Sequence, residues 1–488
     1  MSAAPAPHRA AAPGGWLRRE LGATLALSWP LVLANLAVNV MPAINAMMLG
    51  GLSSRALAAG ALGFYLLQPP FVLGVGVVAA LSPIAAAKIG AGADPEGIRR
   101  ATHQALISAL IIAAATWIVL WPTKSILVAI GEPPDLAADA EIYMRGLQWG
   151  LAPTLLFFAG RSIFSALERP RPTLIAGVIA AGFNVVANDA LIFGKFGMPA
   201  LGLFGSGLAT TLSQTLMFAI LVAASLIDAR VRKARPFALP WSPARREFAA
   251  LWRLGLPIGG TIMAEVGVFS AASLAIGLIG PAALAGHTIA LQIASLAFMV
   301  PLGLGQAATV RVGRAYGACD PTAVARAGWS AFGVTIGFAL LSATTMIAAP
   351  RLLIAPFIDL DQPANAATVG IAIALLRVAA IFQIFDASQA TLANMLRGLH
   401  DSRVPLVMAL IGYWAIGAPV GVALGFATPL GAVGVWIGLA TGLAVVAVLL
   451  MARWLGKARR GFPAQNAGHG AKAEASARPA PQGSQTTP

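Results

Sequence analysis

The chain has 488 residues, of which 58% are hydrophobic and only 10% are charged, and its mean hydropathy is +0.79. So little charge over this length excludes an ordinary soluble protein and indicates a polytopic helical membrane protein. The formal charge of +15 would suit a nucleic-acid-binding protein, but the cations gather in the tails and in alternate loops. That asymmetry is typical of cytoplasmic loops, so we expect a lipid bilayer and no nucleic acid as partner. The single cysteine, Cys319, excludes an internal disulfide.

Twelve apolar segments are predicted to cross the membrane as helices. Each is long enough to span the hydrocarbon at about 1.5 Å per residue. They cover about 22–47, 57–83, 102–121, 142–166, 173–194, 203–226, 254–279, 283–309, 328–349, 368–395, 404–426 and 431–454. The distribution of loop charges places both termini on the cytoplasmic side. We therefore predict an all-α integral membrane fold with twelve transmembrane helices.

Composition divides the chain into two lobes, a linker and two tails. Residues 1–20 and 456–488 are rich in small residues and are expected to be disordered cytoplasmic tails. Residues 228–252 are basic and contain three prolines, which favours a cytoplasmic linker. This linker separates an N-lobe at 21–227 from a C-lobe at 253–455.

An internal repeat relates the two lobes. Asp94-Pro95 in the first half recurs as Asp320-Pro321 in the second, a shift of 226 residues, and the neighbouring cations recur with it. Six spans are an even number, so both lobes begin on the same side of the membrane. We therefore expect two six-helix lobes related by a pseudo-two-fold axis along the membrane normal, with a cavity between them.

One acid lies near the middle of the seventh predicted span. Glu265 is the single charge between Pro257 and Pro281, and Phe269 lies one helical turn away on the same face. A central acid costs about 2.5 to 3.5 kcal/mol on insertion scales, so such residues usually face a cavity and mark an ion or substrate route. Burial favours the neutral acid, so a proton or a bound cation can switch its charge. The alternative is a structural acid paired with a buried arginine or a backbone donor.

A second acid belongs to a polar stripe in the tenth predicted span. The stripe comprises Phe382, Gln383, Asp386 and Gln389, whose spacing places them on one side of a helix. Carboxylate and amide oxygens suit Na⁺ coordination or a hydrogen-bonded proton site. Glu265 and Asp386 are therefore the candidate cation-coupling residues. The alternative for Asp386 is an ion pair with Arg377, but a separation of nine residues points the two in roughly opposite directions.

Polar residues of the first half are mostly amides. Asn184 and Asn188 share one face of the fifth predicted span, Asp189 adjoins them, and Asn45 lies in the first span. Amides can hydrogen-bond a substrate that lines a cavity, but they cannot cycle a proton near neutral pH. The alternative is that they hold helices together, which is the ordinary role of asparagine in membranes. Asp189 also lies near Lys195 and can belong to the membrane interface.

His287 and Gln292 are weaker candidates for the lining of the cavity. Both lie in the eighth predicted span, where a lone histidine is more often satisfied by a neighbouring helix. No spacing in the chain is typical of a metal cluster, a phosphate-binding glycine loop or a nucleophile triad, so we expect no enzyme and no cofactor.

An ordered set of short motifs resembles the multidrug and toxic compound extrusion (MATE) transporters over about residues 20–455. The motifs are Met48-Leu-Gly-Gly51, Trp252-Arg-Leu-Gly-Leu-Pro257 before Glu265, Leu284-Ala-Gly-His287, Arg311-Val-Gly-Arg314 and Leu396-Arg397-Gly398. The resemblance implies a monomeric secondary antiporter of the bacterial inner membrane that exports amphipathic, often cationic compounds in exchange for Na⁺ or H⁺. It also implies that Glu265 and Asp386 are the cation-site carboxylates.

Two residues depart from the family pattern. Asn45 stands where many bacterial members carry an aspartate, and Phe382 stands where some carry a tyrosine. Both departures favour coupling in the C-lobe. A lipid-linked oligosaccharide flippase of the same superfamily is the alternative function. That class usually has more spans and a basic cavity, whereas the predicted interior holds only Arg161 and Arg377.

Overall fold

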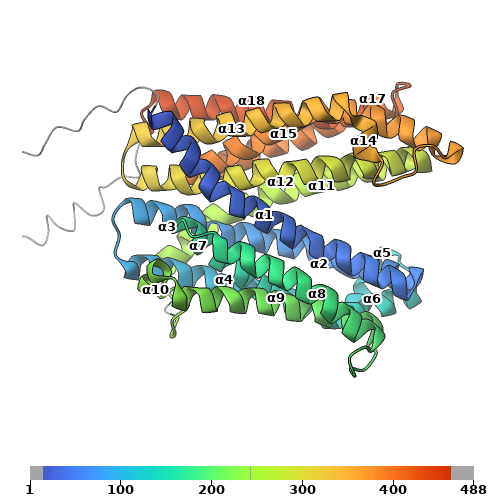
Figure 1. The fold of residues 1–488 in the computed structure, drawn as a ribbon, viewed down its shortest axis with the longest axis horizontal. Helices are drawn as coiled ribbons and strands as arrows, with labels where there is room; N and C mark the ends of the chain where they lie inside the picture. Colours follow the sequence, from blue (N-terminus) through green and yellow to red (C-terminus); the bar gives the residue numbers. More distant parts are fainter. Residues whose placement is uncertain (1–14, 242, 463–488) are drawn as a thin grey trace, which may run out of the picture.

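The computed structural model describes residues 15–241 and 243–462, and these form two bundles of helices lying side by side (Figure 1). No strand occurs in these residues. The N-lobe contains α1 (Gly15–Leu52), α2 (Ser54–Ala79), α3 (Leu81–Gly90), α4 (Pro95–Leu120), α5 (Thr123–Ile130), α6 (Pro134–Leu147), η1 (Gln148–Gly150), α7 (Leu151–Ala166), α8 (Arg171–Phe193), α9 (Gly202–Ile227) and α10 (Ala229–Ala234). The C-lobe contains α11 (Arg245–Ile279), α12 (Pro281–Gly317), α13 (Pro321–Ala348), α14 (Pro350–Ile354), η2 (Pro363–Asn365), α15 (Ala366–Gly398), α16 (Arg403–Leu410), η3 (Ile411–Gly417), α17 (Ala418–Phe426) and α18 (Ala432–Arg459).

The predicted number of crossings is confirmed, although several are not single helices. Within the described ranges, eleven helical segments are long and apolar enough to span a membrane on their own. The remaining crossing is assembled from α6, η1 and α7, which follow one another without a gap from residue 134 to residue 166. The helices α2 and α3 make one crossing with a break at Ala80, near Pro83. A proline cannot donate to the preceding turn, which is an ordinary cause of such breaks.

Three helix ends lie further out than the sequence predicts. The first helix begins at Gly15, within the predicted tail, and its Glu20 accepts a hydrogen bond from Arg311 of α12. The helix α11 begins at Arg245, within the predicted linker, where Trp252 Nε1 donates to Ser108 Oγ at 3.0 Å. The last helix continues to Arg459. The disorder predicted for residues 1–14 and 463–488 lies outside the described residues.

The internal repeat appears as the same helix start in each lobe. Asp94 caps α4 by accepting from the Gly97 amide at 2.9 Å, and Asp320 caps α13 by accepting from the Ala323 amide at 2.9 Å. Each aspartate is followed by a proline at the first helical position. An acidic cap followed by proline is a strong signal for a helix start, so the repeated residues define equivalent positions in the two lobes.

The lobes are joined at the end of the molecule that holds Gly15 and Arg459, which we call the basic end; the opposite end is the far end (Figure 1). The ends of α3 and α12 cross there backbone to backbone. A Cβ built on Gly90 would lie 1.9 Å from the carbonyl oxygen of Arg314, and one built on Gly317 would lie 1.9 Å from that of Ala87. Only glycine permits this approach.

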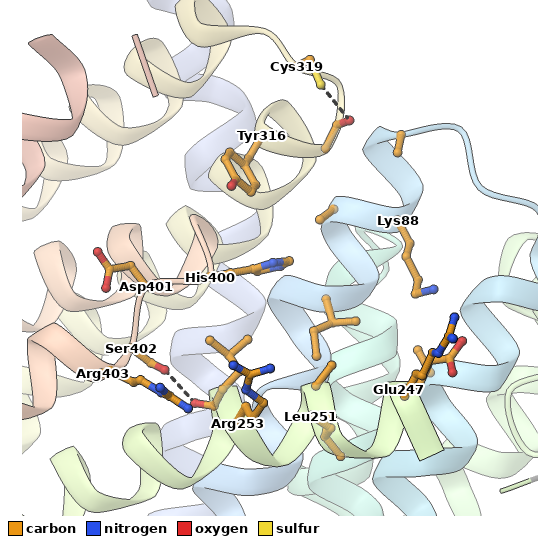
Figure 2. A pocket seen from close by; sticks show the side chains of 18 of the residues that line it. Lys88, Glu247, Leu251, Arg253, Tyr316, Cys319, His400, Asp401, Ser402 and Arg403 are labelled. Atoms are coloured by element: carbon orange, nitrogen blue, oxygen red, sulfur yellow. Dashed lines mark hydrogen bonds between the residues drawn. The ribbon is translucent and has the colours of Figure 1, made fainter. Parts of the chain in front are cut away.

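A histidine adds a hydrogen bond across the lobes at the basic end. His400 lies in the loop after α15, and Figure 2 shows its ring reaching towards α3. Its Nε2–H donates to the carbonyl oxygen of Pro83 at 3.2 Å. Arg314 of α12 also forms an ion pair with Glu168 of the N-lobe at 2.6 Å. The basic end is therefore held closed by backbone packing and by polar contacts.

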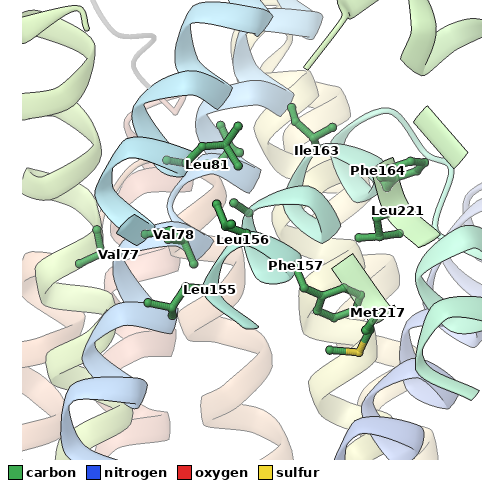
Figure 3. Packing of buried hydrophobic residues seen from close by; sticks show 14 of the residues in the cluster. Val77, Val78, Leu81, Leu155, Leu156, Phe157, Ile163, Phe164, Met217 and Leu221 are labelled. Atoms are coloured by element: carbon green, nitrogen blue, oxygen red, sulfur yellow. The ribbon is translucent and has the colours of Figure 1, made fainter. Parts of the chain in front are cut away.

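Each lobe has a hydrophobic core, and that of the N-lobe also includes Leu254 and Ile258 of α11. In the N-lobe, Phe157 and Phe164 of α7 pack against Met217 and Leu221 of α9, as Figure 3 shows. In the C-lobe the largest buried side chains are Trp436 and Trp454. The two lobes therefore share apolar packing where α11 meets α2.

Candidate functional site

A cavity of about 720 Å³ lies between the two lobes. The N-lobe contributes residues of α1, α2, α3 and α7 to its walls, and the C-lobe contributes residues of α11, α12 and α15. Among the described residues, the hydrogen bonds and ion pairs that join the lobes lie at the level of this cavity or between it and the basic end. The cavity is thus sealed from the basic end.

The two candidate coupling acids meet in this cavity. Glu265 of α11 and Asp386 of α15 both line it, and Asp386 is buried. Gln389 Nε2 donates to Asp386 Oδ1 at 3.3 Å, and Gln389 also lies near Glu265. Neither carboxylate forms a direct ion pair with any cation in the described ranges. The arrangement is two neighbouring carboxylates with one amide beside them.

A cation that lies just beyond the tenth predicted span also lines this cavity. Arg397 lies in the last turn of α15, lines the cavity and acts electrostatically on Glu265. Its Nη1 donates to Asn394 Oδ1 at 3.3 Å. The sequence carried a signal for this placement. Eleven residues separate Asp386 from Arg397, and at about 100° per residue that separation returns to within about 20° of the same helix face.

A buried tyrosine completes the surroundings of the acids. Tyr413 is 1% exposed, and its hydroxyl has no hydrogen-bond partner. It lies close enough to Glu265 and Asp386 to interact electrostatically with both carboxylates. The residue belongs to the π-helical stretch η3, and the next residue, Trp414, donates to the carbonyl oxygen of Ala264 at 3.1 Å. Such π-helical insertions are rare in proteins overall, and those that occur are often found at functional sites.

Aromatic rings lie beside the acids in the C-lobe. Phe269 and Phe382 both line the cavity, with ring centroids 5.9 Å apart and planes at 71°. Phe382 in turn packs on Trp436 at 5.4 Å. The faces of such rings carry negative potential, so they attract organic cations as well as apolar groups. The cavity can therefore accommodate an amphipathic compound.

His287 is fully hydrogen-bonded behind this aromatic cluster. Trp436 Nε1 donates to His287 Nδ1 at 3.0 Å, and His287 Nε2 lies 2.8 Å from Ser273 Oγ. Because an indole nitrogen can only donate, the Nδ1 atom is the acceptor and the proton is on Nε2. His287 does not line the cavity. It holds α11, α12 and α18 together.

Arg161 lies in the wall of the cavity without an acidic partner in the described residues. It is 6% exposed and donates to Asn35 Oδ1 of α1 at 2.6 Å. A second hydrogen bond from the same nitrogen reaches Gln306 Oε1 of α12. Since α12 belongs to the other lobe, this guanidinium joins the lobes by hydrogen bonds to amides.

The predicted amides of the N-lobe form a network of their own. Asn188 Nδ2 donates to Asn45 Oδ1 at 2.9 Å, and Asn45 Nδ2 donates to Thr210 Oγ1 at 2.9 Å. Asn184 Nδ2 donates to Ser213 Oγ at 3.2 Å. All five side chains are buried, and none lines the central cavity. The network connects α1, α8 and α9 inside the lobe.

Three further predicted residues lie away from the cavity. Asp189 forms an ion pair with Lys195 at 2.9 Å near the far end. Gln292 is exposed on α12. Gln383 is fully buried on α15, and neither atom of its amide has a partner. Of the candidates in the predicted cavity lining, the structure thus brings Phe269, Phe382 and Gln389 together with the two acids.

The donor set of the cavity suits a hard monovalent cation or a proton. Within residues 15–241 and 243–462, no group of three or more His, Cys, Asp or Glu side chains converges as in a transition-metal site. Carboxylate and amide oxygens are the ligands that hard cations prefer, and a carboxyl pair can also hold a proton.

Known proteins share this sequence pattern and this fold. The MatE family matches residues 30–188 and 257–423. The probable multidrug resistance protein NorM of Mesorhizobium japonicum is 48% identical over 460 residues, which cover 94% of this chain and 98% of that relative. The probable NorM of Brucella suis is 43% identical and covers 89% of this chain and 93% of its own length.

Solved structures agree in fold at lower identity. The eukaryotic MATE transporter AtDTX14 superposes with a TM-score of 0.79 at 22% identity and covers 92% of this chain and 99% of its own. An outward-facing multidrug resistance MATE family transporter gives a TM-score of 0.80 at 22% identity, with 93% and 99% covered. The family match extends over both lobes, and the relatives have nearly the same length. The chain therefore belongs to the MatE family, the multidrug and toxic compound extrusion transporters.

Proposed function

We propose that this transporter exports amphipathic, often cationic compounds across the inner membrane of a bacterium in exchange for Na⁺ or H⁺. One observation carries the proposal: Glu265 and Asp386 lie together in the cavity between the lobes, beside an aromatic pair and without a direct ion pair. An acid inside a membrane protein is costly unless it serves an ion or substrate route. The relatives named as multidrug resistance proteins support export as the direction of transport.

The orientation follows from the charges at the two ends. The basic end holds both described chain ends and the loops with Lys88 and Arg314, so we place it in the cytoplasm. The cavity is sealed at that end, and the state described here is accordingly closed to the cytoplasm. A compound held in it can leave only towards the far end, which we place on the periplasmic side.

The two acids supply the exchange. While both are ionised they attract a cationic compound that rests against Phe269 and Phe382. When Na⁺ or H⁺ enters from the far side, it neutralises charge at Glu265 and Asp386 and weakens this attraction. The compound then departs, and the neutralised pair allows the lobes to reorient. Release of the ion into the cytoplasm restores the binding state.

The membrane potential can drive this cycle when the exported compound carries less positive charge than the ions that enter. One positive charge moving inwards releases about 2.3 kcal/mol per 100 mV. At about 1.4 kcal/mol per tenfold concentration ratio, that energy sustains roughly a fiftyfold gradient of an exported neutral compound. We propose that a monomer carries out the whole cycle, because one chain supplies both lobes that form the walls of the cavity.

The lipid-linked oligosaccharide flippase is the weaker alternative. A diphosphate group requires a cavity dominated by cations. This cavity holds Arg161 and Arg397 but also two carboxylates, and the arginines already donate to side-chain amides. The balance of charge therefore favours a cationic or neutral cargo.

Ethidium efflux from pump-deficient bacteria tests the proposed function. Cells that express the protein should accumulate less dye than cells with an empty vector. Cells with the double variant Glu265→Gln, Asp386→Asn should accumulate as much dye as the empty-vector cells. Cells with Asp359→Asn, a change in an exposed loop of the same lobe, should accumulate as little as cells with the native protein. Immunoblots of membranes establish equal expression. Full efflux by the double variant would exclude the two acids as the coupling site.

A further inference from the structure

A second cavity opens at the basic end. Its volume is about 920 Å³, and its walls come from both lobes (Figure 2). The N-lobe contributes α3 and the start of α4, and the C-lobe contributes the start of α11, the end of α12 and the loop between α15 and α16. We call this cavity the basic-end cleft. It is separate from the central cavity, because the two share no lining residue.

Cations dominate the lining of the cleft. Lys88 projects from the N-lobe side, while Arg253 and Arg403 lie on the opposite wall, as Figure 2 shows. Arg246 adds a fourth cation from α11. None of the four forms an ion pair with an acid in the described residues. Arg246, Arg253 and Arg403 are exposed, so their guanidinium groups are available to a ligand.

The two acids of the cleft are engaged by cations that do not line it. Glu247 pairs with Arg100 at 3.8 Å. Asp401 lies 3.0 Å from Arg453 and 3.1 Å from Lys457. Both acids of the cleft are thus paired with other cations, and the four cations that line it have no acidic partner in the described residues.

This arrangement has a physical consequence for the closed state. Closing the basic end brings Lys88 of one lobe towards the arginines of the other, and like charges repel across the cleft. A multivalent anion in the cleft would replace this repulsion by attraction to both lobes. Phosphate oxygens can accept two parallel hydrogen bonds from one arginine and a charged hydrogen bond from a lysine.

We propose that the basic-end cleft binds a phosphate-bearing anion, with Lys88 on one side and Arg253 and Arg403 on the other. The bound anion bridges the two lobes and stabilises the state closed at this end. Basic pockets between helices on the cytoplasmic side of membrane proteins bind anionic lipid head groups. A soluble diphosphate offers the same oxygens, so the shared chemistry is a phosphate with at least two charges. The site is independent of the coupling ion.

The chain provides its own reporter for this site. Cys319 is the single cysteine of the sequence, it is exposed, and it lines the cleft. An anion that occupies the cleft and holds it shut will slow the reaction of this thiol with a maleimide. The full-length chain can therefore be measured without introducing a label site.

The experiment compares maleimide labelling rates in three kinds of nanodisc sample. The first contains phosphatidylcholine alone, the second adds inorganic pyrophosphate at an ionic strength matched with NaCl, and the third replaces part of the lipid with cardiolipin. Slower labelling with pyrophosphate identifies free phosphate as a ligand, and slower labelling only with cardiolipin identifies a lipid head group. Unchanged labelling in both would overturn the proposal.

Matched variants separate the cleft from general surface charge. The double variant Arg253→Gln, Arg403→Gln removes two cations of the cleft. Because each cation contributes to the attraction of an anion, the apparent affinity of the cleft for pyrophosphate or cardiolipin should fall by about tenfold or more. The double variant Arg171→Gln, Arg245→Gln removes two exposed cations at the basic end that do not line the cleft. It should leave the slowing of Cys319 labelling by the anion unchanged. Equal slowing in both double variants would contradict a site in the cleft. Unfolding temperatures establish that both variants are folded.

Discussion

Arg161 of α7 and Gln306 of α12 form a hydrogen bond that joins the two lobes across the central cavity. The guanidinium is buried, and Asn35 is its other acceptor. A buried charge held by amides rather than by an acid can be released at lower cost than an ion pair. The contact is therefore well suited to a transporter whose lobes separate at each cycle.

Removing the acceptor on α12 should destabilise the closed state. Gln306→Leu leaves an Arg161 donor unsatisfied, which should lower the free energy of unfolding by about 1–3 kcal/mol. Chemical unfolding of the purified protein measures this change. Gln292→Leu on the same helix is the control, because Gln292 is exposed and should shift the free energy by less than about 0.5 kcal/mol. Equal values for the two variants would show that the contact across the lobes contributes nothing.

The close crossing of α3 and α12 at Gly90 and Gly317 predicts how easily the basic end opens. Gly317→Ala places a Cβ 1.9 Å from the Ala87 carbonyl oxygen, so α3 and α12 must separate. We expect Cys319 to react faster with a maleimide and the protein to lose about 1–3 kcal/mol of stability.

Gly333→Ala is the matched control for the crossing, because a Cβ at Gly333 meets no atom within 4 Å. Alanine in a helix interior is favoured over glycine, so this variant should be neutral or stabilising. If Gly317→Ala labels at the same rate as the native chain, the crossing is not what closes the basic end.

The unpartnered hydroxyl of Tyr413 predicts opposite effects on stability and on ion binding. Because the hydroxyl has no partner in the structure, Tyr413→Phe should leave the free energy of unfolding unchanged or raise it by about 1 kcal/mol. If the hydroxyl assists Glu265 and Asp386 in holding a cation, the same change should weaken cation affinity by about tenfold.

Tryptophan fluorescence, to which Trp436 beside Phe382 contributes, can report the cation titration. Tyr65→Phe, at an exposed position, is the control for the loss of one hydroxyl. A loss of stability in Tyr413→Phe without a change in affinity would assign the hydroxyl a purely structural role.

Much of the fold could be predicted from the sequence because the bilayer constrains it. Hydropathy predicted the twelve crossings, and the cap residues Asp94 and Asp320 marked equivalent helix starts in the two lobes. The start of α11 was harder to predict. Its first turns are basic and resemble a linker, but they contact α4 through the hydrogen bond of Trp252 to Ser108 and the ion pair of Glu247 with Arg100.

The candidate site could be predicted in part. Glu265 and Asp386 were recognisable as acids inside apolar helices, and the structure places them in one cavity; their role in coupling stays a prediction. Arg397 lies just beyond the tenth predicted span, although its periodicity places it on the face of Asp386. Tyr413 had no such signal, because a π-helical register breaks the periodicity on which the argument depends.

Contacts between distant helices could not be predicted from a single sequence. The amides of Asn45 and Asn188 suggested a polar surface of the cavity, but they bond to each other inside the N-lobe. Arg161 was predicted to lie in the interior, and its partners there are amides of α1 and α12. Both outcomes depend on which helices become neighbours.

Drug export from proteoliposomes, with a sodium gradient and a pH gradient imposed separately, tests the central claim most directly. At least one gradient should drive transport by the native protein, and neither should drive it in the variant Glu265→Gln, Asp386→Asn. Binding of the drug without a gradient establishes that the variant is folded. Gradient-driven transport by this variant at the native rate would contradict the account.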